Sequence, residues 1–444
     1  MVLCCSAINT ILGVIMIRRD DENSLLKLWN GGVKPAYGGR CLSDIPASIA
    51  HILGVAGEGK GLDSSLLGGI DCSGVENVVL LLIDGLGYEM LLPSVGREGF
   101  FKKFADEGSI SPITSVFPST TAAGITSVST GLTTQEHALP EWKVYFREID
   151  MVIDTLPFAS VEHKNLYEIL GDGADPKMLY NGSTLSERLS DSGVEAFNVT
   201  WKNIQKSAYN SIIKRGSAGI PYTKNSDAAI ILRRIIESRR GGRAYIDFYT
   251  DSVDSVTHTY GPGSEESAAE IADLSDILDR ELLGKISRED AMKTLLVMTA
   301  DHGHARIRPE KTVYLNDYPE IIGSFEIGLS GRPIPPTGSC RDVFLHIKRE
   351  FLDRTIEMLT EEFGSFAKVV RTEDAIKEGL FGLNSPKKEF YDRVGNVMLL
   401  PDAERPIWYE FVQGKKMEDK GMHGGLSRQE MMIPFGMARL SDLL

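Results

Sequence analysis

Cysteine is scarce in this chain of 444 residues, and its spacing excludes two common uses of that residue. The five cysteines are odd in number and form no CxxC pair. They therefore indicate neither a disulfide-stapled secreted scaffold nor a thiolate zinc module. The sequence predicts reduced thiols, as is usual in a cytosolic protein. The five are Cys4, Cys5, Cys41, Cys72 and Cys340.

Positive charge is also in short supply. Lys and Arg number 48 against 62 Asp and Glu, which gives a formal net charge of -14. No basic stripe offsets this excess, so the sequence argues against binding of a nucleic-acid duplex. A small phosphate ester stays open as a substrate, because bound metal ions can reverse the local sign of charge.

A membrane-spanning run is absent as well. Residues 2–17 are mostly apolar, but a spanning helix takes about 20 residues. A signal peptide would carry basic residues before the apolar stretch, whereas Arg18 and Arg19 follow it, and no small-residue cleavage site stands out. We expect a buried or flexible extension, with Met16 as an alternative start. The expected location is cytoplasmic, with secretion as the minority alternative.

What the chain does contain is an alternation of strand-like and helical segments. Apolar content of 42% and charged content of 25% are ordinary for a soluble globular protein. The alternation predicts an α/β fold with a largely parallel sheet covered on both faces. Strands are expected at residues 77–83, 244–249, 294–298 and 431–440, and helices at 120–129, 185–189 and 227–239.

A second pattern lies between the third and fourth of these strands. It has the order β-α-β-α-β, which predicts a small α+β subdomain inserted in the core. We therefore divide the chain into a catalytic core, residues 1–319 and 401–444, and an insertion, residues 320–400. The expected elements are strands at 342–348, 367–371 and 393–400 and helices at 350–362 and 372–378.

Five short segments place metal-type ligands or hydroxyls at the ends of apolar runs. In open α/β sheets, sites form beyond the carboxyl ends of the strands, so these ligands fall where a site is expected. Together the segments supply three carboxylates, three imidazoles and a hydroxyl nucleophile, enough for a two-metal hydrolytic centre. The segments are residues 78–85, 119–122, 254–258, 299–303 and 421–424.

Local spacing supports this interpretation. Asp254 and His258 are four residues apart, which puts both on one face of a helix. Gly303 after Asp301-His302 permits a close turn that directs both side chains to one site. Any one of these patterns is weak when taken alone. His304 lies near the same centre and is interpreted as a neighbour of the ligands rather than as a ligand.

In this order the segments resemble the alkaline phosphatase superfamily, most closely its nucleotide pyrophosphatase/phosphodiesterase branch. The resemblance spans residues 77–440 and implies a three-layer α/β/α sandwich. The matching parts are Ile83-Asp84-Gly85, residues 121–131, residues 254–262, Thr299-Ala-Asp301-His302-Gly303 and Met422-His423.

The resemblance also implies two metal sites. Carboxylate and imidazole ligands suit zinc best, with manganese or iron as alternatives. In the superfamily the nucleophile opens a helix ten residues before a Thr-Gly glycine, and Gly131 lies ten residues after Thr121. Thr120 would then cap the helix. One site would be Asp84, Asp301 and His302, with Thr121 as reactive ligand; the other would be Asp254, His258 and His423.

The implied reaction is hydrolysis of a phosphate ester, most simply a phosphodiester or nucleotide pyrophosphate, through a phosphothreonine on Thr121. Two divalent ions against three aspartates leave a centre that is net positive before Thr121 ionises and about neutral afterwards. Such a centre attracts an anionic ester. The expected partner is a small phosphate ester or nucleotide; the oligomeric state is left open.

One position departs from the family pattern. Counting from Thr121, the phosphate-binding asparagine of the family falls on Trp142. Trp142 is expected either to stack on a base or sugar or to pack as part of the rim. Lys143 is expected to replace the lost phosphate contact.

Several alternatives stay open at this site. A phosphomonoesterase or a phosphonate hydrolase would use the same ligands. A phosphoglycerate-mutase-like transferase ordinarily has serine where Thr121 stands. A sulfatase needs a Cys/Ser-x-Pro-x-Arg segment, which the nucleophile segment lacks. A non-catalytic metal-binding protein would need no hydroxyl beside its ligands.

Overall fold

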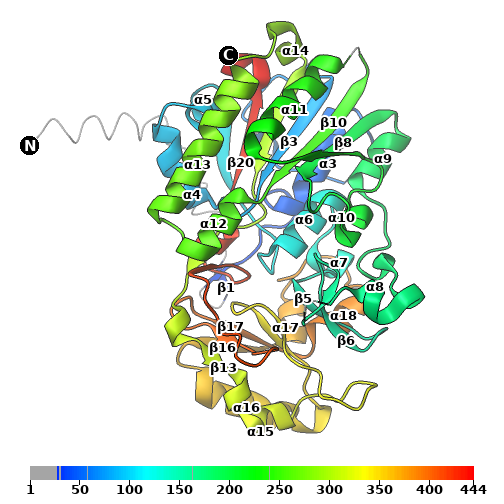
Figure 1. Cartoon of the computed structure of the whole chain (residues 1–444), viewed down its shortest axis with the longest axis vertical. Helices are drawn as coiled ribbons and strands as arrows, with labels where there is room; N and C mark the ends of the chain where they lie inside the picture. Colours follow the sequence, from blue (N-terminus) through cyan, green and yellow to red (C-terminus); the bar gives the residue numbers. More distant parts are fainter. Residues whose placement is uncertain (1–27, 30–31, 58, 163, 240) are drawn as a thin grey trace, which may run out of the picture.

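The computed structural model describes residues 28–29, 32–57, 59–162, 164–239 and 241–444 (Figure 1). The apolar extension expected at residues 2–17 lies outside the described residues. Within the described part of the chain, no helix is both long and apolar enough to cross a membrane.

A seven-stranded sheet forms the centre of the upper part of the molecule in Figure 1. Six strands run in one direction and β20 alone is antiparallel to its neighbours, so the predicted mainly parallel sheet is confirmed. Across the sheet the order is β4 (Ser109–Thr114), β20 (Met432–Arg439), β11 (Thr294–Thr299), β3 (Asn77–Ile83), β10 (Arg243–Thr250), β8 (Val194–Trp201) and β9 (Ala218–Tyr222).

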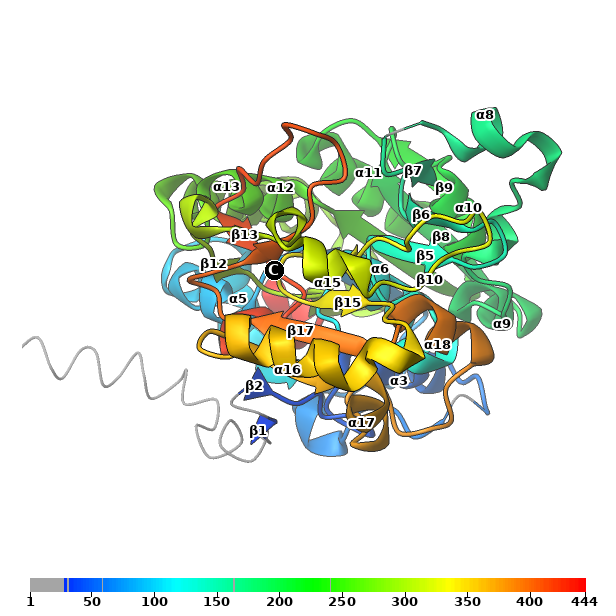
Figure 2. The same cartoon turned by 90° about the horizontal axis from the view of Figure 1, so that it is seen from below.

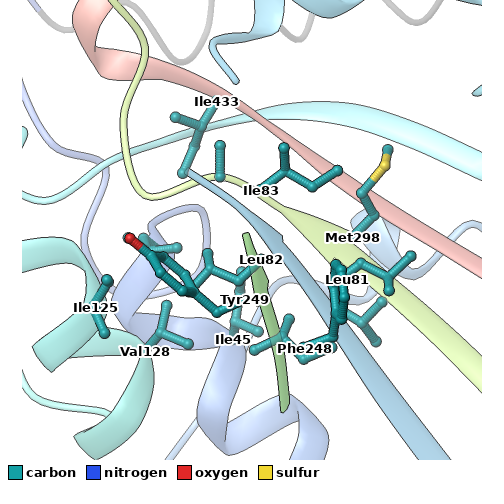
Figure 3. Close-up of a cluster of buried hydrophobic side chains, with 14 of the residues drawn as sticks. Ile45, Leu81, Leu82, Ile83, Ile125, Val128, Phe248, Tyr249, Met298 and Ile433 are labelled. Atoms are coloured by element: carbon teal, nitrogen blue, oxygen red, sulfur yellow. The ribbon is translucent and has the colours of Figure 1, made fainter. Parts of the chain in front are cut away.

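The central strand β3 is buried along its whole length, which explains its continuous apolar run. A strand covered on both faces has no polar face to show to water. Figure 3 shows Leu81, Leu82 and Ile83 of β3 packed among other apolar side chains, with Ile125 and Val128 contributed by α6 (Thr121–Thr130). This core fixes the end of β3, and therefore the residue that follows it.

Two groups of helices cover the faces of the sheet (Figure 1). Connections between parallel strands are right-handed. The side on which the next strand is added to the sheet therefore decides which face the connecting helix covers. One face carries α5 (Phe100–Glu107), α11 (Asn225–Ser238) and α13 (Glu265–Leu278); the other carries α3 (Ile45–Ile52), α6 (Thr121–Thr130), α9 (Leu185–Asp191) and α10 (Ala208–Ile213).

A second, four-stranded sheet occupies the lower part of the molecule, where Figure 2 shows it beside α16 (Leu352–Phe363). Its strands alternate between two cores. Val343 and Leu345 pack in a separate cluster with α16, whereas Phe344 between them joins the main core. Across the sheet the order is β14 (Thr337–Gly338), β15 (Val343–Leu345), β17 (Val397–Pro401) and β16 (Ala367–Arg371).

One expected strand of this region begins too early. Residues 393–400 were expected to form a single strand, but α18 (Lys388–Val394) covers the first two, and β17 starts at Val397. Phe390, Arg393 and Val394 are the buried side chains of α18, which is the three-and-four spacing of a helix. Gly395 then has φ 58°, a conformation that ends the helix.

The lower part also contains segments from outside residues 320–400. A three-stranded sheet, β5 (Lys143–Phe146), β6 (Met151–Asp154) and β7 (Ala159–Ser160), lies there (Figure 1). The separate core includes Leu315 and Ile407 as well. As a division into units, the insertion at 320–400 stays a prediction.

Shorter elements connect these sheets. The helices are α4 (Tyr88–Leu91), α7 (Thr134–His137), α8 (Leu166–Leu170), α12 (Ser252–Tyr260), α14 (Arg288–Met292), α15 (Pro319–Gly323), α17 (Thr372–Lys377) and α19 (Arg428–Met431). The strands are β1 (Leu28–Trp29), β2 (Gly32–Val33), β12 (Ala305–Arg306), β13 (Val313–Tyr314), β18 (Ile407–Trp408) and β19 (Gly421–Met422).

A buried ion pair joins the two parts of the molecule. Arg341, in the turn between β14 and β15, forms two 2.9 Å hydrogen bonds with the carboxylate of Glu430 in α19. Both side chains are buried, at 3% and 0% exposure. Glu430 also accepts the backbone N–H groups of Gly425 and Ser427. The pair therefore holds the loop that follows His423.

We expect Arg341→Met to destabilise the protein by about 3 kcal/mol or more, because it leaves the charge of Glu430 buried without a partner. The midpoint of urea unfolding, measured with metals removed by a chelator, tests this. Arg371→Met is the matched control, since Arg371 and Asp353 form an exposed pair in the same lower part. Equal shifts in the two variants would contradict the assigned role of the buried pair.

Candidate active site

The segments singled out from the sequence meet at one edge of the large sheet. Asp84 directly follows β3, and Asp301 and His302 follow β11. Asp254 and His258 lie on α12, which begins two residues after β10 ends. Parallel neighbours β11, β3 and β10 end at the same edge, so their following residues come together.

The first cluster contains two carboxylates, an imidazole and the predicted nucleophile. His302 Nε2 lies 3.3 Å from Asp84 Oδ1 and 3.5 Å from Asp301 Oδ2. The same nitrogen is 3.0 Å from Thr121 Oγ1. The other ring nitrogen, Nδ1, lies 3.1 Å from the carbonyl oxygen of Gly303. Nδ1–H donates to that carbonyl, which leaves the lone pair of Nε2 directed at the cluster.

Two oxygens of this cluster are buried and find no hydrogen-bond donor among the residues that the structure describes. They are Asp84 Oδ1 and Asp301 Oδ2, on side chains that are 1% and 0% exposed. Burial, together with the charges of the neighbouring carboxylates, raises the pKa of Asp84 well above its usual value. Burial also raises the pKa of Asp301. Unpaired acceptors facing one point fit a cation between them.

The second cluster surrounds Asp254. Its Oδ1 lies 3.4 Å from His258 Nε2 and 4.0 Å from His423 Nε2. The Nδ1 atoms of both imidazoles point away, toward the carbonyl oxygens of Gly421 at 2.8 Å and Ser119 at 3.1 Å. Backbone carbonyls thus orient both Nε2 lone pairs toward Asp254, as in metal-binding histidines.

Charge explains the opposite shifts in this second cluster. Burial alone would raise the pKa of Asp254, but the imidazoles of His258 and His304 hold it well below its usual value. Although burial opposes it, Asp254 raises the pKa of His258 to about 9. The charge of Asp254 therefore favours the protonated form of the imidazoles beside it. A metal ion bound at the same place would displace those protons.

His304 is more central than the sequence interpretation allowed. Its Nε2 lies 2.9 Å from Asp254 Oδ1, and the ring is buried. It packs edge-on against the rings of His258, His302 and His423. The i, i+2 spacing from His302 was the available signal, because alternate residues of an extended segment face the same side. Its position makes His304 a further candidate ligand or partner of Asp254.

The ligand atoms fit two metal ions. In the described part of the chain, Asp84, Asp301 and His302 bring their ligand atoms within 4.8 Å of one another, and so do Asp254, His258 and His423. These are the two sets that the resemblance implied, and a third group, Asp254, His302 and His304, meets the same limit. The structure brings them together, while their roles as ligands stay predictions.

Thr121 begins α6 as its first residue, and Thr120 caps the helix. The Thr120 side chain accepts a hydrogen bond from the backbone N–H of Ala123 at 3.3 Å. Thr120 is therefore engaged as the helix cap, and Thr121 is the candidate nucleophile. Gly124 lets α6 approach the first cluster closely, since a Cβ there would lie 2.7 Å from Cβ of Asp301. The positive end of α6 therefore faces the cluster.

A cleft of about 400 Å³ opens over the second cluster and Thr121. The upper part of the molecule contributes Thr121, Asp254 and His423 to its lining, and the lower part contributes Trp142, Lys143 and Trp408. Trp142 is 44% exposed, consistent with either stacking on substrate or a place in the rim. Lys143 lines the cleft, but its ammonium forms an ion pair with buried Asp154 at 2.5 Å. This pairing weakens the expectation that Lys143 serves as the phosphate contact.

The sequence interpretation missed two residues beside the clusters. The hydroxyl of Tyr249 donates a hydrogen bond to Asp84 Oδ2. Glu141 lines the cleft although its side chain is only 1% exposed. Tyr249 lies one residue before the end of β10, which pairs with β3, so its position could be deduced only from the strand pairing. Glu141 carried no local signal beyond its position next to Trp142.

Comparison with known proteins agrees with this geometry. The model of the type I phosphodiesterase / nucleotide pyrophosphatase family matches residues 78–426. The chain belongs to this family. It is therefore an enzyme of the phosphoric ester hydrolase class. No protein of curated function matches the chain.

Solved structures share the fold. Murine ectonucleotide pyrophosphatase / phosphodiesterase 5 is 15% identical with a TM-score of 0.58, over 81% of this chain and 87% of that chain. Its human counterpart is 16% identical with the same TM-score, over 81% and 87%. Phosphonoacetate hydrolase from Sinorhizobium meliloti 1021 is 16% identical with a TM-score of 0.55, over 83% and 94%. At these identities the likeness concerns the fold.

We expect Tyr249→Phe to weaken metal binding about 10-fold to 100-fold, because Asp84 loses the hydrogen bond that orients it. Competition between the protein and a chromogenic zinc chelator measures this affinity. Tyr245→Phe is the matched control: it lies four residues earlier on the same buried strand. An unchanged affinity in Tyr249→Phe would show that this hydrogen bond does not support the ligand.

Proposed function

We propose that this enzyme is a two-metal phosphodiesterase that acts through a phosphothreonine formed on Thr121. The observation that carries the proposal is the position of Thr121. Its Oγ1 is 3.0 Å from His302 Nε2 at the helix N-terminus, between two clusters that fit metal ions. A binding protein would need no hydroxyl there.

One metal would be held by Asp84, Asp301 and His302 and the other by Asp254, His258 and His423. When bound, the ions would lower the pKa of the Thr121 hydroxyl and neutralise charge on the phosphoryl and leaving oxygens. Zinc suits these carboxylate and imidazole donors best, with manganese or iron as alternatives.

The chain's own residues define the two displacements. Thr121 Oγ1 forms a bond to phosphorus as the bond to the leaving alcohol breaks. Water then cleaves the phosphothreonine, which still carries the second alcohol of the diester; this releases a phosphomonoester of that alcohol and restores the hydroxyl. The N-terminus of α6 directs its positive end at the phosphoryl oxygens. The α6 backbone is anchored by the Thr120 cap, so the nucleophile is preorganised.

Two relatives of the fold bear on this proposal. Murine ectonucleotide pyrophosphatase / phosphodiesterase 5 has been solved as an inactive threonine-to-alanine variant in complex with AMP. That supports a threonine nucleophile and a nucleotide-sized substrate for this chain. The phosphonoacetate hydrolase structure holds phosphonoformate, so a phosphonate is the second candidate substrate at the same site. A phosphomonoester is the remaining alternative.

We expect Thr121→Ala to lower turnover of an aryl phosphodiester by about 10⁴-fold or more, because the attacking oxygen is removed. Acid quench of the wild type followed by peptide mass spectrometry should recover on Thr121 the phosphoryl group together with the ester substituent that did not leave. Thr120→Ser is the control, since it keeps the helix cap and should keep most of the activity. Full activity in Thr121→Ala would exclude this residue as the nucleophile.

Removal of metal should abolish hydrolysis, and zinc should restore it. Elemental analysis is expected to find two metal ions per chain in the wild type and to find them still bound in Thr121→Ala. His423→Ala should lose the ion of the second site selectively. Equal activity of the metal-free protein would contradict the two-metal proposal.

A panel with one common leaving group separates the substrate classes. It contains an aryl phosphodiester, an aryl phosphonate, an aryl phosphomonoester and an aryl sulfate. The proposal expects the diester to have the highest kcat/KM. A higher kcat/KM for the phosphonate or the phosphomonoester would assign the enzyme to that alternative class. A preference for the sulfate would contradict the diester, phosphonate and monoester assignments alike.

A further inference from the structure

A pair of buried carboxyl groups forms part of the cleft wall and takes no part in the proposed chemistry. Glu141 lines the cleft together with Thr121. Asp342 does not line the cleft, but its side chain interacts with that of Glu141. Their side chains are 1% and 0% exposed. They come from opposite sides of the site, because Glu141 lies between α7 and β5 and Asp342 precedes β15.

The hydrogen bonds of this pair require a shared proton. Glu141 Oε2 accepts the backbone N–H of Trp142, and Asp342 Oδ1 accepts the hydroxyl of Ser339. If both groups were ionised, the remaining oxygens, Glu141 Oε1 and Asp342 Oδ2, would have no donor among the described residues. The two carboxyls are nevertheless hydrogen-bonded to each other. Carboxylate oxygens are acceptors only, so a proton must lie between them.

The pair therefore carries one negative charge when it shares one proton, and it is held rigidly. On one side, the hydroxyl of Thr120 donates to the carbonyl of Pro140, the residue before Glu141, at 3.1 Å. On the other, Ser339 also contacts the carbonyl of His423 at 3.2 Å. Burial raises the pKa of Glu141 to about 7, so the charge is present above that pH.

No free cation offsets this charge along the described lining of the cleft. Lys143 is the one Lys or Arg side chain there, and Asp154 already binds its ammonium. Arg341, next to Asp342 in sequence, is bound by Glu430. A further carboxylate, Asp419, lines the cleft beyond His258. Away from the metal clusters, the walls are therefore negative.

We propose that the Glu141–Asp342 pair is a specificity-determining element that favours monoanionic phosphodiesters over dianionic phosphomonoesters. The inference rests on the proposed function and names the charge of the substrate that the site prefers. A diester brings one negative charge to the site, and a monoester brings two. The second charge of a monoester meets the charged pair with no cation to receive it.

The expected size follows from Coulomb's law. At a separation of about 8 Å and an effective dielectric constant of about 20, one extra substrate charge is disfavoured by roughly 30-fold. Solvent and metal ions in the cleft would reduce this value. We therefore expect the pair to contribute about 10-fold to the discrimination between the two esters.

Because the pair shares one proton, amide substitutions can separate the effect of its charge from the effect of its hydrogen bonds. In Glu141→Gln the amide replaces the proton as donor, and Asp342 keeps the single negative charge. In Asp342→Asn the same holds with the partners exchanged. Only the double variant, Glu141→Gln/Asp342→Asn, is neutral, and it still allows an amide–amide hydrogen bond. The single variants therefore control for shape and hydrogen bonding, and the double variant tests charge.

The substrates are methyl para-nitrophenyl phosphate and para-nitrophenyl phosphate, which share a leaving group and differ by one methyl group. The assays use the zinc-loaded enzyme at about pH 8.5, above the pKa of Glu141. Glu76→Gln controls for net charge, since Glu76 precedes β3 and lies at the opposite end of that strand from Asp84. Circular dichroism and metal content confirm that each variant is folded and loaded.

We expect the diester-to-monoester ratio of kcat/KM to fall about 10-fold in the double variant. It should stay within about twofold in both single variants and in Glu76→Gln. An unchanged ratio in the double variant would overturn the inference. So would an equal fall in Glu141→Gln, since that would assign the effect to hydrogen bonding instead of charge.

A binding measurement keeps this inference separate from the proposed function. Calorimetry compares inorganic phosphate, a dianion at this pH, with dimethyl phosphate, a monoanion, on the zinc-loaded protein. The double variant should gain affinity for phosphate about 10-fold relative to dimethyl phosphate. If the wild type hydrolyses none of the esters, the proposed function fails, and this ratio still decides for or against the charged pair.

Discussion

The concentration of negative charge at the ends of three parallel strands governs the rest of this molecule. Asp84, Asp301 and Asp254 follow β3, β11 and β10, and unpaired oxygens of the first two are buried. Charges so placed are stable only with counter-charges beside them. The imidazoles, the helix N-terminus and the tyrosine hydroxyl are all arranged around that requirement. Metal ions would satisfy it most fully, and with them the same residues would form the proposed hydrolytic centre.

The lower part of the molecule completes the site that the large sheet begins. The small sheet packs one face on its own core and the other on the main core, so its turn at residues 339–342 has a fixed position over the clusters. Arg341 reaches from that turn to Glu430 and holds the loop after His423. His423 is thus a ligand candidate whose placement depends on two sheets that are distant in sequence.

Electrostatics differ between the floor and the walls of the cleft. The floor holds imidazoles, carboxylates and the positive end of α6, and it would become positive with metals bound. The walls carry Glu141–Asp342 and Asp419, while the ammonium of Lys143 is neutralised by Asp154. A substrate must therefore concentrate its charge at the floor and present a neutral remainder to the walls. That arrangement matches a diester linked to an uncharged or aromatic group near Trp142.

The sequence by itself determined most strands of the large sheet and the helix that begins at Thr121, and its resemblance to a known family picked out the residues of the two clusters. Buried parallel strands have continuous apolar sequences, and the candidate ligands follow directly at their ends. The strands and ligands at residues 77–84 and 294–302 could therefore be predicted from the local sequence. The start of β17, the partner of Lys143, the bond from Tyr249 to Asp84 and the carboxyl pair were decided by the tertiary structure alone. Each depends on a contact between residues far apart in the chain, and no local periodicity records such a contact.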